Sequence, residues 1–148
     1  MLSFYKWFIG SQNDLTGQFQ NNEQLFYQAR NFWNNLETIT VPIVIVMLVV
    51  GIGMAVYYYT IFNNKPGRHY RPVWWLIFMG VALIVTLVVS LSIEIGLCAP
   101  KLHGTLVLEI MLALGNALYA CIAYLVMSVV WCNLLPTNAY RLLKFKKR

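Results

Sequence analysis

The sequence predicts an all-α integral membrane protein with three transmembrane helices preceded by an N-terminal amphipathic interfacial helix, and three observations indicate this class. Of the 148 residues, 59% are hydrophobic and only 11% are charged, and the mean hydropathy is +0.62, whereas a soluble domain carries roughly 25% charged residues. The apolar residues form long unbroken blocks. Many of the basic residues lie in short runs beside these blocks, where they set orientation and contact anionic lipid head groups.

The N-terminal region, residues 1–37, is too polar to cross a membrane but has an amphipathic pattern. Ser11 and Asp14 have the spacing of a capping box, and apolar residues then recur on one seven-residue pattern that Asn22 interrupts. Such a helix lies flat in the head-group layer, or it packs on neighbouring subunits or a partner outside the membrane; both interpretations stay open. The apolar positions are Leu15, Phe19, Phe26, Ala29, Trp33 and Leu36.

The transmembrane domain is expected at residues 38–135. Each of its apolar blocks exceeds the roughly 20 residues that a spanning helix needs. Pro42 suits the first turn of a helix and disfavours helix at Val41, so we expect the chain to break there. Pro136 ends the third block. The spans are expected at about 39–62, 73–98 and 105–135.

The distribution of lysine and arginine predicts the orientation. Eight of them lie in the loop after the first span and in the basic tail, residues 136–148, against three on the other side, at Lys6, Arg30 and Lys101. Basic residues favour the cytoplasmic side. The prediction is therefore an N-terminus outside and a cytoplasmic C-terminus, in an inner or plasma membrane. The eight residues expected at the lipid head groups are Lys65, Arg68, Arg71, Arg141, Lys144, Lys146, Lys147 and Arg148.

Small and polar residues form one stripe on each expected span. In the second span the residues of this stripe recur every four positions and end at a carboxylate, and in the third they begin with one. The first span contributes a pair at small-xxx-small spacing. A charge within the bilayer is costly unless it faces protein or water, so we expect these stripes to face other helices or a lumen. The stripes are Ala82, Thr86, Ser90 and Glu94; Glu109, Ala113, Asn116 and Ala120; and Gly51 with Ala55.

Three interpretations of the carboxylates are open. In the first, Glu94 and Glu109 belong to a helix-packing network, protonated or paired with Lys101 or His103, and Asn116 bonds across helices. In the second, several identical chains place them in a ring that attracts cations at the mouth of a pore, with Asn116 deeper in the lumen. In the third, His103, Glu109 and Glu94 form a metal site or a proton relay.

We find no combination of residues typical of an enzyme. His69 and His103 lie in loops on opposite sides of the expected membrane, and the cysteines show no CxxC spacing. We therefore expect neither a catalytic residue nor a metal or other cofactor. Nucleic acid is not expected as a partner, because the basic residues suit a membrane surface.

The expected function is that of a non-enzymatic membrane protein that assembles in the bilayer with copies of itself, as a pore or channel. The alternative is an accessory subunit of a larger membrane complex, of the secretion or respiratory type, that docks on unlike chains. The three spans, small size and basic tail are similar in layout, though not in any motif, to small pore-formers such as phage holins.

Overall fold

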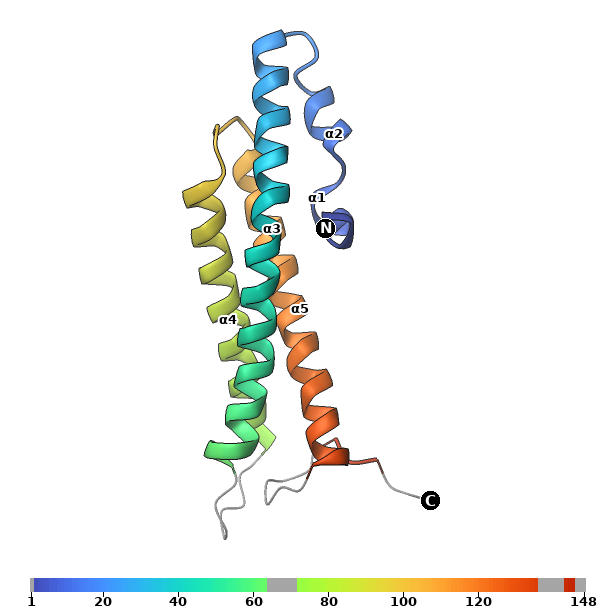
Figure 1. Ribbon diagram of the computed structural model, residues 1–148, viewed down its shortest axis with the longest axis vertical. Helices are drawn as coiled ribbons and strands as arrows, with labels where there is room; N and C mark the ends of the chain where they lie inside the picture. The colour runs from blue at the N-terminus through green and yellow to red at the C-terminus, as the bar shows by residue number, and fades with distance from the viewer. Residues whose placement is uncertain (1, 64–71, 136–142, 146–148) are drawn as a thin grey trace. The chain divides into compact units, whose positions relative to one another are not determined.

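The computed structural model describes residues 2–63, 72–135 and 143–145, and Figure 1 shows their course. The structure is 85% helical and has no strand in this part of the chain, which confirms the all-α class. A 3₁₀ turn, η1, precedes α1, and a π-helical turn, η2, continues α3. The elements are η1 (Leu2–Tyr5), α1 (Lys6–Ile9), α2 (Gln12–Gly17), α3 (Glu23–Tyr57), η2 (Tyr58–Phe62), α4 (Pro72–Leu97) and α5 (Thr105–Leu134).

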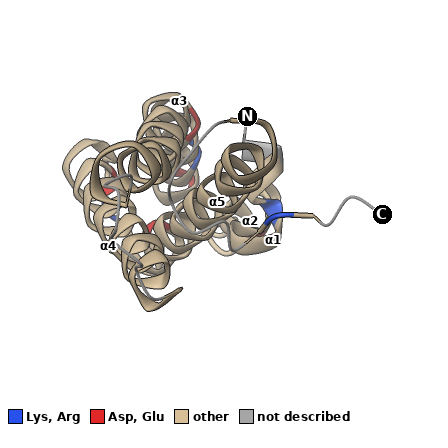
Figure 2. Ribbon diagram, turned by 90° about the horizontal axis from the view of Figure 1, so that it is seen from below, with Lys and Arg blue, Asp and Glu red and all other residues tan. Residues whose placement is uncertain are grey.

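Among the described residues, three helical segments are long and apolar enough to cross a membrane: Glu23–Phe62, Pro72–Leu97 and Thr105–Leu134. The second and third match the expected spans to within a residue at each end. The first contains the expected span but begins sixteen residues earlier. Charged residues are sparse along all three segments, as the few blue and red positions in Figure 2 show.

The amphipathic stretch is divided between two helices. Its capping box is present, since Asp14 accepts hydrogen bonds from the backbone N–H and the hydroxyl of Ser11, but α2 ends at Gly17. Asn22, which interrupts the apolar pattern, caps α3: its Oδ1 accepts the backbone N–H of Leu25 at 3.2 Å. The second half of the pattern therefore belongs to the same helix as the first candidate span.

The predicted break at Val41 is wrong, because α3 runs through Pro42 without ending. Proline removes one backbone donor, but the remaining bonds of a 35-residue helix hold it on both sides. Threonine side chains also support the backbone here: Thr38 Oγ1 donates to Asn34 O at 3.0 Å and Thr40 Oγ1 to Leu36 O at 2.8 Å. Helices of this apolar kind tolerate proline with such help.

The chain forms two compact units, and the first consists of residues 1–46 and 87–116. Its core takes large apolar side chains from α3, among them Phe32, Leu36 and Ile43, together with Leu112 of α5. The N-terminal segment packs on α5, where the ring of Phe8 lies so close to Gly115 that a Cβ there would meet it at 2.9 Å.

The second unit consists of residues 47–86 and 117–148, and its core is aromatic. Tyr58, Tyr59, Trp75 and Tyr124 are buried in it. Their polar atoms find partners, as buried tyrosine and tryptophan require: Trp75 Nε1 donates to Ser128 Oγ at 3.1 Å, and Tyr124 Oη donates to Trp75 O at 3.2 Å. Sequence reasoning did not find this cluster.

Candidate functional site: the buried polar residues of α4 and α5

The polar stripe of α4 lies on the buried side of that helix. Ala82, Thr86, Ser90 and Glu94 are all fully buried, while the residues between them include exposed isoleucine and valine side chains. A spacing of four residues keeps the stripe on one side of the helix. It follows that α4 turns this stripe inward, while isoleucine and valine side chains between its members lie outward.

The stripe of α5 is buried as well. Glu109, Ala113, Asn116 and Ala120 have no exposed surface. On α3, Gly51 and Ala55 are buried too, and the backbone of α5 comes so close to Gly51 that a Cβ there would lie 2.6 Å from the carbonyl oxygen of Ala120. Each small residue predicted to allow close packing is thus buried.

Asn116 joins three segments of the first unit. Its Oδ1 accepts the hydroxyl of Tyr5 at 2.9 Å, and its Nδ2 donates to Ser90 Oγ at 2.6 Å and to Ile43 O at 3.2 Å. The amide therefore ties α5 to α4, to α3 and to the N-terminal segment. Sequence reasoning missed Tyr5, because nothing in the pattern around it indicates that the chain folds back onto α5.

Glu109 is held by an ion pair. Lys101, from the loop between α4 and α5, donates to its Oε1. The lysine side chain is 45% exposed, whereas Glu109 is fully buried, so the pair places a buried carboxylate next to a cation that reaches it from the surface. The expected pairing of a glutamate with Lys101 is present in the structure.

Glu94 differs from Glu109 although both are fully buried. Neither of its carboxylate oxygens has a hydrogen-bond partner among the described residues, and the same holds for Oε2 of Glu109. The charged groups that act on Glu94 are Glu109 and Lys101. The structure thus brings Glu94, Glu109 and Lys101 together as one cluster, which we call the carboxylate cluster.

The structure offers no support for the metal interpretation. His103 is exposed, and in residues 2–63, 72–135 and 143–145 no group of three or more His, Cys, Asp and Glu could hold a metal ion.

Thr86, another residue of the α4 stripe, is buried, and its hydroxyl has no hydrogen-bond partner among these residues. It belongs to the second unit, whereas the carboxylate cluster belongs to the first.

Most of the basic residues expected at the lipid head groups lie outside the described part of the chain. Lys144 is described and is exposed. The others are Lys65, Arg68, Arg71, Arg141, Lys146, Lys147 and Arg148.

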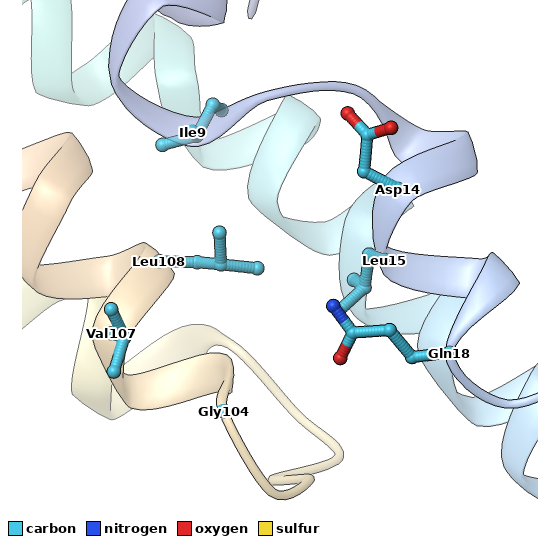
Figure 3. A pocket seen from close by; sticks show the side chains of 7 residues that line it. All are labelled: Ile9, Asp14, Leu15, Gln18, Gly104, Val107 and Leu108. Atoms are coloured by element: carbon cyan, nitrogen blue, oxygen red, sulfur yellow. The ribbon is translucent and has the colours of Figure 1, made fainter.

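An open cavity of about 310 Å³ lies beside α1, α2 and the start of α5, and Figure 3 shows the side chains around it. Its polar groups are Asp14 of α2 and Gln18 just after that helix, and its other lining residues are apolar or glycine. The Asp14 carboxylate already accepts the hydrogen bonds of Ser11, which favour its ionised form and lower its pKa. No predicted site residue lines this cavity, so the carboxylate cluster remains the stronger candidate.

Comparisons of this chain with protein families, with curated proteins and with solved structures find no match. Function must therefore be inferred from the residues and their geometry.

Proposed function

We propose that this chain is a non-enzymatic integral membrane protein that assembles with copies of itself in the bilayer and forms part of a pore or channel. One observation carries the membrane placement: the polar residues of the α4 and α5 stripes lie inside, while large apolar side chains lie outside. Glu94, Glu109 and Asn116 are fully buried, and leucine, isoleucine and valine are exposed on α3, α4 and α5. Lipid can cover such a surface, whereas water cannot do so without a large cost.

Helix α4 is the element that favours assembly. Only 17% of its most apolar stretch is buried, against 28% and 39% for the other two candidate spans. Ser92 and Gly96 are exposed at small-xxx-small spacing, and nothing lies within 4 Å of the position that a Cβ at Gly96 would take. The Ser92 hydroxyl donates to Val88 O at 2.7 Å, so its polarity is satisfied within the helix. Such a pair lets another helix approach closely.

The carboxylates have a different place in this proposal from the one that the sequence suggested. Because Glu94 and Glu109 are buried among the helices of a single chain, their geometry supports a polar path within each subunit better than a ring of carboxylates shared between subunits. An ionisable residue inside a membrane domain is by default a candidate for ion or proton handling.

The proposal also includes the orientation. The N-terminal segment lies outside and the C-terminal tail lies in the cytoplasm, in an inner or plasma membrane, because the basic residues gather in the loop after the first span and in the tail. Those residues contact anionic lipid head groups.

An accessory subunit of a larger membrane complex is the second candidate, and the N-terminal segment favours it. Phe4 and Trp7 are 73% and 97% exposed and lie outside the three candidate spans. Large exposed aromatic side chains are typical of surfaces that bind a partner or the interfacial layer of a membrane.

The mass of the purified chain in detergent, measured by light scattering, tests the assembly. The proposal expects a closed homo-oligomer that Gly96→Leu disrupts, because the larger side chain fills the approach on α4. Gly80→Leu is the matched control, since Gly80 is also a glycine of α4 with open space around it, and it should leave the mass unchanged. A monomer that is stable only with other chains would favour the accessory subunit.

Cation flux into reconstituted vesicles tests the pore. Glu94→Gln and Glu109→Gln should change the flux, because each removes an ionisable group from the polar path. A flux that both substitutions leave unchanged would remove the carboxylate cluster from the path.

A further inference from the structure

The carboxylate cluster has an imbalance of charge. If Glu94, Glu109 and Lys101 were all ionised, two negative groups would share one positive group. Lys101 donates to Glu109, while both oxygens of Glu94 and the second oxygen of Glu109 are buried without a hydrogen-bond partner among the described residues. A buried carboxylate without a partner is strongly destabilising when ionised, so the cluster lacks one positive charge.

The surroundings of Glu94 do not supply this charge. Besides Glu109 and Lys101, the titratable residue next to it along the chain is Cys98, which is buried one turn further on. The titratable residues of α3 in this unit are all exposed: they are Glu23, Tyr27, Arg30 and Glu37. A multivalent metal ion does not supply the charge either, because no group of three or more His, Cys, Asp and Glu among the described residues could hold one.

We propose that Glu94 and Glu109 form a proton-binding site that takes up a single proton, which resides on Glu94 while Lys101 pairs with Glu109. With that proton the cluster is neutral. It has a second neutral arrangement: the O–H bond of Glu94 breaks, an O–H bond forms on Glu109, and the ammonium of Lys101 moves its hydrogen bond from Glu109 to Glu94 while it keeps its three protons. One proton thus passes between the two carboxyl groups with no change in net charge.

The position of Lys101 suits this exchange. Its side chain is 45% exposed and comes from the loop between α4 and α5, so it can move between two buried partners more readily than a residue fixed within a helix. In this respect the site rests on the proposed function: it makes the polar path within each subunit a path for protons. It also rests on a single chain, so it can be tested whether or not that chain assembles.

Infrared spectroscopy of the full chain in detergent tests the proposal, because the carbonyl stretch of a protonated carboxylic acid is separate from the carboxylate bands. The chain has only five Asp and Glu residues, and exposed ones, with an ordinary pKa of about 4, are ionised at pH 7. The expected result at pH 7 is one carboxylic-acid band with the intensity of a single group. Glu94→Gln should abolish it, and Glu23→Gln, which changes an exposed glutamate at the start of α3, should leave it unchanged.

Two further variants separate a proton site from a residue that merely packs. Lys101→Met removes the positive group, so both carboxyl groups should be protonated and the band should double. Glu109→Gln leaves Lys101 with Glu94 alone, so Glu94 should give up its proton and the band should disappear. These two variants keep the test informative if Glu94→Gln does not fold, which circular dichroism of each variant would show.

The absence of a carboxylic-acid band from the folded wild-type protein at pH 7 would overturn the proposal. A band that appears only after sodium and potassium are removed would also overturn it, because the site would then bind an alkali cation. A band that Lys101→Met leaves at the intensity of one group would contradict the shared lysine. None of these results depends on oligomer mass or vesicle flux, so failure of the proton site and failure of the channel can be told apart.

Discussion

Asn116 shows how much of this fold depends on a single buried side chain. An amide has two donor hydrogens and an acceptor oxygen, and Asn116 uses both kinds of atom to reach Tyr5, Ser90 and Ile43. In an apolar environment such groups have no water to bond with. Removal of the amide therefore leaves buried partners unsatisfied on separate segments of the chain.

Asn116→Ala is expected to lower the free energy of unfolding by about 1–3 kcal/mol, since it leaves buried polar groups without a partner. Asn31→Ala, at an exposed position of α3, is the control and should change stability by less than about 0.5 kcal/mol. Unfolding in a denaturing detergent measures both. A double-mutant cycle with Tyr5→Phe should show positive coupling, and purely additive effects would mean that the N-terminal segment does not bond to Asn116 in solution.

Asp14 provides a prediction about pH. The hydrogen bonds from Ser11 favour the ionised carboxylate and lower the pKa of Asp14 below its ordinary value of 3.8. The capping box is therefore complete above that value, and its contribution is lost as the pH falls through the lowered pKa. Ser11→Ala should raise the pKa of Asp14 toward 3.8, as an NMR titration of the side-chain carboxyl would show. An unchanged pKa would contradict the capping box.

In the second unit, α3 and α5 approach each other closely at a small residue, Gly51. Gly51 lies where α3 meets the backbone of α5, and a side chain there would collide with a carbonyl group that cannot rotate away. Gly53, two residues later on the same helix, has open space around it. Of the two glycines, Gly51 is therefore the one whose lack of a side chain the packing requires.

Gly51→Ala should destabilise the protein by about 1–3 kcal/mol, because the helices must separate to admit the methyl group. Gly53→Ala should be neutral or stabilising by up to about 1 kcal/mol, since alanine favours a helix and meets nothing. Thermal unfolding followed by circular dichroism measures the pair. Equal effects at both positions would show that α3 and α5 do not approach each other at Gly51.

The proposed orientation applies to the whole molecule. Three crossings place the two ends of a chain on opposite sides of a membrane, and the excess of basic residues in the first loop and the tail favours the cytoplasm for the C-terminus. Gln20 and Phe145 are both exposed, so they can report on the two sides.

Single cysteines at Gln20 and Phe145, introduced after replacement of Cys98, Cys121 and Cys132, should be labelled from opposite sides of intact vesicles. A membrane-impermeant maleimide should reach Gln20→Cys from outside and Phe145→Cys only after the vesicles are opened. Labelling of both from the same side would exclude three crossings.

Much of the candidate site could be predicted from local spacing. The four-residue repeat through Ser90 and Glu94 places these residues on one side of a helix, and the cost of an exposed charge in an apolar block predicts that this side faces inward. The pairing of Glu109 rather than Glu94 with Lys101 could not be predicted, because both glutamates lie within a few residues of the lysine in sequence. The role of Tyr5 depends on a contact across 111 positions.

The sequence by itself determined the helical class, the three apolar segments, the capping box and the polar side of α4 and α5, because each follows from composition or from a spacing of a few residues. Only the tertiary structure decided that Asn116 bonds to the N-terminal segment and that Glu94 has no hydrogen-bond partner among the described residues. These features depend on which side chains meet across the bundle, and a hydrogen bond forms or fails over a few tenths of an ångström, a distance that no pattern along the chain specifies.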